Sequence, residues 1–246
     1  GDSAVDRAAS MVEQGASIID VGGESTRPGG DPVNAELELD RVLPVIERLS
    51  VAVDVPISID TSKADVAAAA IGAGATMVND IHGLAADPDL AGVVADAGVP
   101  IVLMHMRGAP GRMYEAARYN DLIADIVREL RGALDRAHRA GIDPELTLVD
   151  PGIGFGKNSL QSLQLLRRAG DFRQHGLRVL VGHSRKSFLK NLTGEDRAEK
   201  DLATLGASLQ LCAQGVDILR VHDVPLHAAA FRGSSHLSTA ATSAPG

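Results

Sequence analysis

Residues 56–80 read PISIDTSKADVAAAAIGAGATMVND, and this stretch shows the repeating unit of the chain. An apolar run, PISID, is followed by an alanine-rich stretch, a glycine signal and a second apolar run, MVND. The two apolar runs predict buried β-strands, and the alanine-rich stretch predicts a helix that ends at the glycine signal. The whole stretch therefore predicts a β-α-β unit with parallel strands.

The same alternation continues in both directions along the chain. The apolar runs are SIIDVG, PISID, MVNDI, PIVLMH, LTLVD, RVLVG and DILRVH, which begin at residues 17, 56, 77, 100, 146, 178 and 217. Because these runs do not alternate with polar residues, we expect strands buried on both faces, as in a parallel sheet covered by helices. The regular repeat favours a (β/α)₈ TIM barrel over an open doubly wound sheet, which seven strands would also allow.

The two ends of the chain set the expected domain organisation. The sequence begins with a helical pattern, Ser3–Gln14, so we count it as helix 1 followed by strands 2 to 8. We therefore expect an α/β barrel whose strand 1 is missing from the given chain. Residues 1–233 are expected to form this domain, and residues 234–246, rich in Ser, Thr and Ala, a flexible polar tail.

Composition narrows the class of partner. The 24 basic residues are outnumbered by 32 acidic ones, a net charge of −8, which disfavours binding to nucleic acid. The longest apolar stretch, residues 66–78, is broken by glycines and is shorter than the roughly 18–20 residues of a membrane span. The single cysteine, Cys212, in a predicted core helix, indicates a reducing compartment. We therefore expect a cytoplasmic protein that binds small molecules.

Polar side chains follow every predicted strand. In a barrel, such residues project at the face where the active site lies. For Asp60, which Thr61 and Ser62 follow, helix capping alone would be a sufficient explanation. Seven consecutive polar strand ends are harder to explain by capping, and they favour a functional site. The strand ends carry Glu24–Arg27, Asp60, Asn79, His105, Asp150, Ser184–Ser187 and Arg220–Asp223.

The charges separate into two groups along the chain. Arg185, Lys186, Arg220 and His222 follow the last two strands, where barrels frequently bind phosphate, and Arg27 lies in a loop bounded by glycine and proline. This group is suited to a diphosphate.

The second group consists of hydrogen-bond acceptors. Asp60, Asn79 and Asp150 are suited to a heterocycle edge with several N–H donors, and Met104, Phe155 and the Arg220 guanidinium could pack against its ring. The predicted ligand is thus a nitrogen heterocycle that carries phosphate.

Two motifs resemble catalytic signatures but lack essential positions. The stretch beginning at Gly182, GHSRK, has Lys186 where a nucleophile elbow needs glycine, so Ser184 is a poor nucleophile candidate. The stretch from Gly152 to Lys157 lacks the first glycine and the final Ser or Thr of a P-loop. The sequence also has neither an HExxH motif nor paired cysteines, which disfavours tightly held zinc; His105 and His222 remain possible polar ligands.

Seven motifs together resemble those of the dihydropteroate synthases, the folate-pathway enzymes that sulfonamides inhibit. In chain order they are GGESTRPG, SIDT, VNDI, VLMHMRG, LVDPGIGFGK, VGHSRKSF and LRVHDV. The resemblance runs from helix 1 to about His227. It implies a (β/α)₈ barrel that joins 6-hydroxymethyl-7,8-dihydropterin diphosphate to p-aminobenzoate and releases pyrophosphate with the help of Mg²⁺. It also implies a homodimer.

The resemblance assigns roles to individual residues. Lys186, Arg220, His222 and Arg27 would be catalytic, through leaving-group stabilisation and positioning. The family's Mg²⁺-contacting Asn belongs to its first strand, so no metal ligand is assigned here. The substrate-binding residues implied are Asp60, Asn79, Met104, Asp150, Phe155 and Lys186 for the pterin, Arg220 and His222 for the diphosphate, Thr26 in the covering loop, and Ser187 near the p-aminobenzoate carboxylate.

Two other readings remain open. The methyltetrahydrofolate-binding methyltransferases resemble this family in their Asp and Asn contacts with the pterin, but a methyl carrier does not need the cations of SRKS and RVHD. A catalytically impaired pterin-binding module is the non-enzymatic alternative, since the first strand is absent. Pterin binding without pyrophosphate release would identify such a module.

Overall fold

The computed structural model describes residues 2–25, 33–108, 118–189 and 196–242. Within them, seven short strands form one sheet in which every neighbouring pair is parallel and the spatial order is the chain order. The strands are β1 (Ile19–Gly22), β2 (Ile57–Asp60), β3 (Met77–Asp80), β4 (Ile101–Met104), β5 (Thr147–Asp150), β6 (Arg178–Val181) and β7 (Ile218–Leu219). Each of the seven predicted strands is therefore confirmed.

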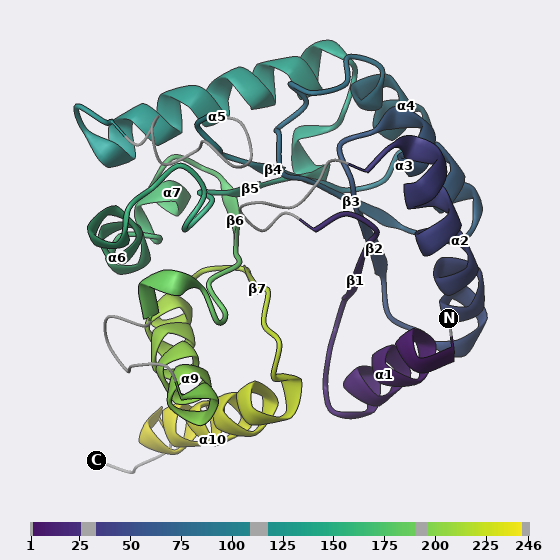
Figure 1. The fold of residues 1–246 in the computed structure, drawn as a ribbon. Helices are drawn as coiled ribbons and strands as arrows, with labels where there is room; N and C mark the ends of the chain where they lie inside the picture. Colours follow the sequence, from purple (N-terminus) through teal and green to yellow (C-terminus); the bar gives the residue numbers. More distant parts are fainter. Residues whose placement is uncertain (1, 26–32, 109–117, 190–195, 243–246) are drawn as a thin grey trace.

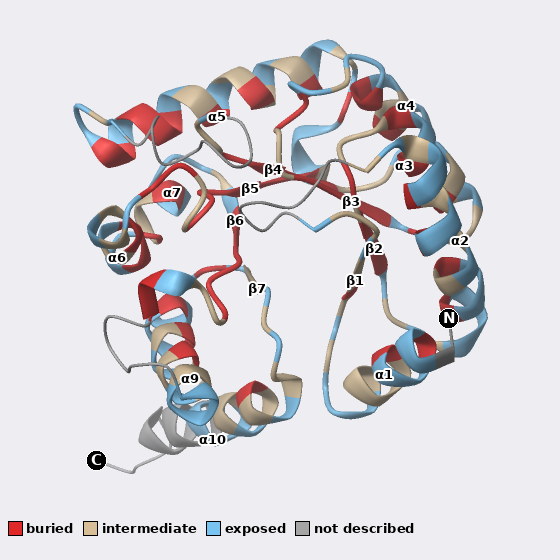
Figure 2. Ribbon diagram, viewed as in Figure 1, coloured by how far each residue is buried: buried red, intermediate tan, exposed pale blue. Residues whose placement is uncertain are grey.

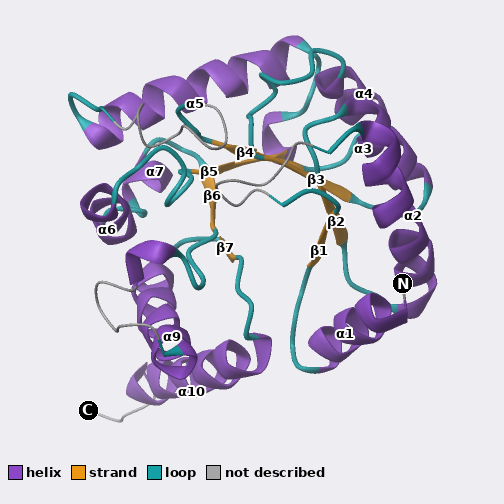
Figure 3. Ribbon diagram, in the orientation of Figure 1, coloured by secondary structure: helices purple, strands orange, loops and turns teal. Residues whose placement is uncertain are grey.

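Helices connect consecutive strands and lie on the outside of a curled sheet (Figures 1 and 3). They are α1 (Asp2–Glu13), α2 (Ala35–Ala52), α3 (Ala64–Gly72), α4 (Leu90–Ala97), α5 (Leu122–Arg139), α6 (Ser159–Arg167), α7 (Asp171–Gln174), α9 (Arg197–Ala213) and α10 (Val224–Thr242), with short 3₁₀ turns η1 (Pro144–Leu146) and η2 (Ser187–Leu189). A doubly wound sheet would reverse its strand order at a switch point, and this sheet does not. The doubly wound alternative is thus excluded.

Side chains pack on both faces of the sheet. Two large apolar clusters include Ile46, Ile59 and Phe172, which are fully buried. Figure 2 shows buried residues along the strands and along parts of the surrounding helices. A smaller cluster of Met77, Val102, Leu148 and Leu180 contacts the half-buried Ile18 and Ile218 near the two ends of the sheet. Burial on both faces explains why the strands are continuously apolar in sequence.

Local sequence sets where the helices begin and end. The Asn34 side chain caps α2 by accepting from Leu37 N at 2.9 Å, and Asn158 forms a reciprocal capping box with Gln161 at the start of α6. At the end of α4, Gly98 has φ 62° and lets the chain turn from the helix into β4. These signals set the ends of the helices, and the parallel arrangement of the strands places the strand ends on the same side of the sheet.

Two sequence-based expectations about the C-terminal part were wrong. The segment from Ser234, expected to be a flexible tail, continues α10 as far as Thr242. Cys212 does lie in a helix, α9, but its side chain is exposed instead of packed in the core. Among the described residues, none of the helices has the length and apolar character that crossing a membrane requires.

Residues 151–157, here called the β5 loop, approach the end of β4 so closely that only glycine fits at Gly152. Its φ is +67°, and a Cβ there would lie 1.9 Å from the carbonyl oxygen of His105. We expect Gly152→Ala to lower the free energy of unfolding by about 3 kcal/mol or more, because backbone strain and a clash with backbone combine. Urea denaturation measures this change.

Gly72→Ala is the matched control for that substitution. Gly72 is exposed in the last turn of α3, and a Cβ there meets nothing within 4 Å. We expect this change to raise the free energy of unfolding by about 0.5–1 kcal/mol. Equal stability of the two variants would contradict the close approach at Gly152.

Candidate active site

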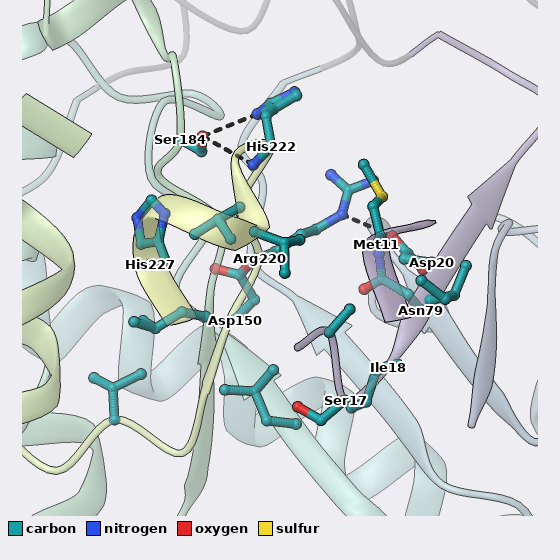
Figure 4. A pocket seen from close by; sticks show the side chains of 18 of the residues that line it. Met11, Ser17, Ile18, Asp20, Asn79, Asp150, Ser184, Arg220, His222 and His227 are labelled. Carbon is teal, nitrogen blue, oxygen red and sulfur yellow. Dashed lines mark hydrogen bonds and ion pairs between the residues drawn. The ribbon is translucent and has the colours of Figure 1, made fainter. Parts of the chain in front are cut away.

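A cavity of about 580 Å³ lies at the carboxyl ends of the strands and extends between β1 and β7 (Figure 4). Most of its polar lining comes from residues at or just after strand ends, which the parallel arrangement brings to one side of the sheet. The predicted site residues that line it are Asp60, Asn79, Met104, Asp150, Phe155, Lys186, Arg220 and His222. The structure thus brings together residues that are far apart in the sequence.

Arg220, just after β7, crosses the cavity toward the opposite end of the sheet. Its Nε lies 2.7 Å from Oδ2 of Asp20 on β1, and a terminal nitrogen lies 3.1 Å from Oδ2 of Asp60 on β2 (Figure 4 shows the first contact). The Arg220 side chain remains 51% exposed, so its cation is also accessible to a ligand. It is a suitable anchor for an anion at the mouth of the cavity.

Two carboxyl groups on the cavity wall hold their protons more tightly than usual. Burial and the neighbouring charge of Asp20 raise the pKa of Asp60 to about 7, although Arg220 acts in the opposite direction. Burial also raises the pKa of Asp150, whose Oδ1 accepts from Gly152 N at 2.7 Å. Asp60 can therefore change charge near neutral pH when a ligand with N–H donors replaces water around it.

Lys186 supplies a second cation, after β6. Burial lowers its pKa to about 8, while the charge of Asp150 opposes this shift. Its Nζ donates to the carbonyl oxygen of Ile153 and lies 4.4 Å from the centre of the Phe155 ring. The β5 loop thus orients the lysine, and the lysine and the aromatic ring form one surface of the cavity.

Ser184 and His222 join the last two strand ends. Ser184 Oγ lies 2.9 Å from Nδ1 of His222 and accepts from its backbone N at 3.2 Å (Figure 4). The contact explains the role of the serine in the GHSRK stretch: it orients a histidine and does not lie in a nucleophile elbow. His222 is exposed at the cavity lining, where it can donate to an anion.

Other sequence-based candidates lie elsewhere or outside the described residues. Ser187 is exposed and absent from the described lining of the cavity, and His105 is buried behind the lining. The guanidinium of Arg185 is bound by both carboxylate oxygens of Asp201, at 2.7 and 3.0 Å, and Arg185 lines a neighbouring pocket with His222 instead of the cavity itself. Thr26 and Arg27 lie outside the described residues.

Asp20 is the site residue that our reading of the sequence missed. It lies within the apolar run SIIDVG, and a charged residue in a buried strand was the signal that could have identified it. Its Oδ1 is one of the buried side-chain atoms for which the described part of the chain provides no hydrogen-bond partner. Such an oxygen is a candidate contact for a ligand group or a cation.

The cavity therefore combines two kinds of polar group, which meet where Arg220 contacts Asp60. Carboxyl and amide groups on β2, β3 and β5 suit a heterocycle with several N–H donors, and the cations after β6 and β7 suit a diphosphate. Ser184 and His222 lie within hydrogen-bonding distance of each other in this lining, but the serine does not lie in a nucleophile elbow, so the site favours positioning over covalent catalysis.

Comparison with known proteins agrees with this geometry. Residues 1–222 match the family described as pterin binding enzyme. A dihydropteroate synthase from Synechocystis is 44% identical over 223 residues, which cover 90% of this chain and 77% of that protein. The chain therefore belongs to the pterin-binding enzyme family.

Solved structures narrow the assignment within that family. The Yersinia pestis dihydropteroate synthase in a sulfonamide complex is 39% identical with a TM-score of 0.92, and the alignment covers 97% of this chain and 86% of that one. The Xanthomonas albilineans enzyme in complex with 7,8-dihydropteroate is 37% identical with a TM-score of 0.85, over 99% of this chain and 86% of that one. Within its family, the chain is a dihydropteroate synthase, a transferase of folate biosynthesis.

Proposed function

We propose that this chain condenses 6-hydroxymethyl-7,8-dihydropterin diphosphate with p-aminobenzoate to give 7,8-dihydropteroate and pyrophosphate. The observation that carries this proposal is the cavity itself, which combines an acceptor-rich wall and the adjacent Lys186 with the cations Arg220 and His222. The pterin matches the first set of groups, and the diphosphate of the same substrate matches the second. A methyl carrier has no diphosphate for Arg220 and His222 to bind.

The seven strands correspond, in this proposal, to strands 2 to 8 of a (β/α)₈ barrel. In the described structure β1 and β7 do not pair with each other, and Ile18 and Ile218 beside them are only half-buried. Both observations are expected where one more strand would complete the sheet. The single barrel domain over residues 1–233, the homodimer and the cytoplasmic location stay predictions.

The pterin binds, as we propose, through its N–H edge. Asp60 and Asp150 accept from the ring and its amino group, Asn79 supplements them, and Phe155 packs against the ring. Lys186 lies beside the same ring, where it can donate to a pterin acceptor atom. These contacts fix the carbon that carries the diphosphate relative to the cations.

The reaction needs no protein nucleophile. The C–O bond of the substrate breaks with its electron pair on the departing pyrophosphate, and Arg220 and His222 stabilise the charge that develops there. The amino nitrogen of p-aminobenzoate forms the new C–N bond and releases a proton to solvent. Catalysis consists of leaving-group stabilisation and positioning, since two bound reactants held in line react as one molecule.

Mg²⁺ is proposed as the cofactor. The described residues hold no group of three or more His, Cys, Asp or Glu side chains that could bind a metal alone. This donor set nonetheless fits Mg²⁺, which is commonly held by one or two carboxylates together with substrate phosphates. The partner-free Oδ1 of Asp20, beside the anion-binding Arg220, is the protein oxygen that would contact it. When bound, the ion would neutralise charge on the diphosphate.

Pterin affinity is expected to be highest between about pH 7 and pH 8. Binding of N–H donors favours ionised Asp60, whose pKa is about 7, so affinity falls as the pH drops below 7 and this group becomes protonated in the free protein. Above about pH 8 Lys186 loses its proton, and affinity falls again. Calorimetric titration with 6-hydroxymethylpterin from pH 5.5 to 9 measures the profile. Asp60→Asn should flatten its acid side, and an unchanged acid side would contradict this role.

The proposed function is tested by the formation of 7,8-dihydropteroate from ring-labelled p-aminobenzoate, the pterin diphosphate and Mg²⁺. Labelled product is the expected result. Pterin binding without product would identify the pterin-binding module instead. Binding of methyltetrahydrofolate in preference to the pterin diphosphate would favour the methyltransferase alternative.

A further inference from the structure

Lys157, the last residue of the β5 loop, is buried with only 1% of its surface exposed, and the proposed reaction does not use it. Its Nζ lies 2.8 Å from Nδ1 of His105, 3.2 Å from the His105 carbonyl oxygen and 2.8 Å from the Phe155 carbonyl oxygen. On the other side of the ring, Nε2 of His105 lies 2.9 Å from a carboxylate oxygen of Glu129 on α5. The carboxylate requires the proton on Nε2, which leaves Nδ1 as an acceptor.

Lys157 thus has three acceptors for the three N–H groups of an ammonium ion. Burial and the charge of Lys157 lower the pKa of His105 to about 3, so the imidazole stays neutral at physiological pH. Burial also lowers the pKa of Lys157, and Asp150 acts against this shift. The arrangement fixes one tautomer of the histidine and one position of the lysine.

The chain of contacts closes into a ring that returns to the β5 loop. Glu129 also accepts from Arg107, and the Arg107 guanidinium lies 4.0 Å from the centre of the Tyr119 ring. The hydroxyl of Tyr119 donates to the carbonyl oxygen of Gly156 at 2.9 Å, one residue before Lys157. This closed set of contacts connects β4, α5 and the segment before α5 to the β5 loop.

This loop carries three elements of the pterin pocket. The backbone N of Gly152 donates to Asp150, the carbonyl of Ile153 accepts from Lys186, and the Phe155 ring lies against the same lysine. The ring of contacts lies behind these groups, since the described cavity lining includes Phe155 and Asp150 but neither Lys157 nor His105. The position of the loop is therefore set from outside the pocket.

We propose that Lys157 is a positioning residue of the pterin pocket, which holds the β5 loop through His105 and Glu129 so that Phe155 and Lys186 meet the pterin. This inference rests on the proposed function. It predicts a selective effect: loss of the Lys157 ammonium weakens pterin binding and leaves the p-aminobenzoate site unchanged. A lysine that only stabilises the fold would lower thermal stability without changing the affinity of the folded protein.

The test compares Lys157→Met and Glu129→Ala with the wild type by titration of 6-hydroxymethylpterin. We expect Kd for this probe to rise about 10- to 100-fold in Lys157→Met, because small misplacements of binding groups have effects of this order. The KM for p-aminobenzoate should stay unchanged. Arg178→Met is the matched control. Arg178 lies at the start of β6, and the change removes its surface ion pair with Glu145, so this variant should bind the probe like the wild type.

Glu129→Ala keeps the test decisive if Lys157→Met does not fold, because the Glu129 side chain is 35% exposed. It removes the carboxylate that fixes the tautomer of His105. The affinity for the probe should therefore fall, and the ¹⁵N signals of His105 should change from those of one tautomer to those of a mixture. Unchanged probe affinity in the folded variants would overturn the inference. A wild-type protein that does not bind the probe at all would overturn the proposed function, and the inference with it.

Discussion

Arg220→Met is expected to lower kcat/KM for the pterin diphosphate by about 10³-fold, the largest loss among the changes considered. Arg220 is the cation that reaches the mouth of the cavity from β7, and it has no replacement at that position among the described residues. Removal of a charged donor that faces the leaving group commonly lowers turnover by 10²–10³-fold, and the diphosphate also loses a binding contact. Steady-state release of pyrophosphate measures the change.

The loss should appear in anion binding as well as in turnover. Arg220→Met leaves the carboxylates of Asp20 and Asp60 facing each other without the cation that now lies between them. Calorimetric titration with pyrophosphate should show weaker binding in this variant. Asp20→Asn, which keeps the arginine and removes a negative charge beside it, serves as the comparison and should bind pyrophosphate in the absence of Mg²⁺ at least as tightly as the wild type. Equal pyrophosphate affinity of Arg220→Met and the wild type would contradict the role of Arg220.

Lys186→Ala is expected to raise Kd for the pterin and to lower kcat/KM by about 10²-fold. The change removes the cation that acts most strongly on buried Asp150, and it removes the group that contacts both Ile153 and Phe155. Breaking a buried charge interaction on one side has costs of this order or larger. Titration with 6-hydroxymethylpterin and steady-state kinetics measure the two effects.

Lys186→Met separates charge from packing at this position. Methionine keeps much of the side-chain volume beside Phe155 but supplies no N–H donor. Both variants should therefore lose pterin affinity to a similar degree. Recovery of wild-type affinity in Lys186→Met would show that the lysine only fills space. The alkaline fall of the wild-type affinity above about pH 8 should be absent from both variants.

The strands and the side on which the site lies could be predicted because both depend on local patterns. Continuous apolar runs ended by Asp60, Asn79 and Asp150 are visible in the sequence, and a parallel sheet brings their ends together whatever the details of packing. The strand order then follows from short right-handed connections between neighbours. Lys186 and Arg220, the two cations of the site, could be predicted for the same reason, since both follow strand ends.

The remaining features depend on contacts between distant parts of the chain. Arg185 and Arg220 are equivalent in the sequence, each following a buried strand, but Asp201 on α9 binds the first and the second faces the cavity. His105 follows a strand in the same way and instead faces α5. The hydrophobic periodicity of the sequence does not predict such contact partners, because they depend on how one particular helix packs against one strand.

The end of α10 shows a different limit of sequence reading. Polar composition after Ser234 suggested a tail, but composition describes solubility more than it describes backbone conformation. Residues 234–242 contain two alanines and five serines or threonines, so intrinsic helix propensity does not account for the extension of α10.

The most direct test of the account follows the bridging oxygen of the substrate. With ¹⁸O between the pterin methylene carbon and the diphosphate, cleavage of the C–O bond, in which Arg220 and His222 stabilise the leaving group, predicts that all of the label leaves in pyrophosphate while p-aminobenzoate takes its place. Label that stays on the pterin as the hydroxymethyl alcohol would show cleavage of the P–O bond, and it would contradict the proposed reaction.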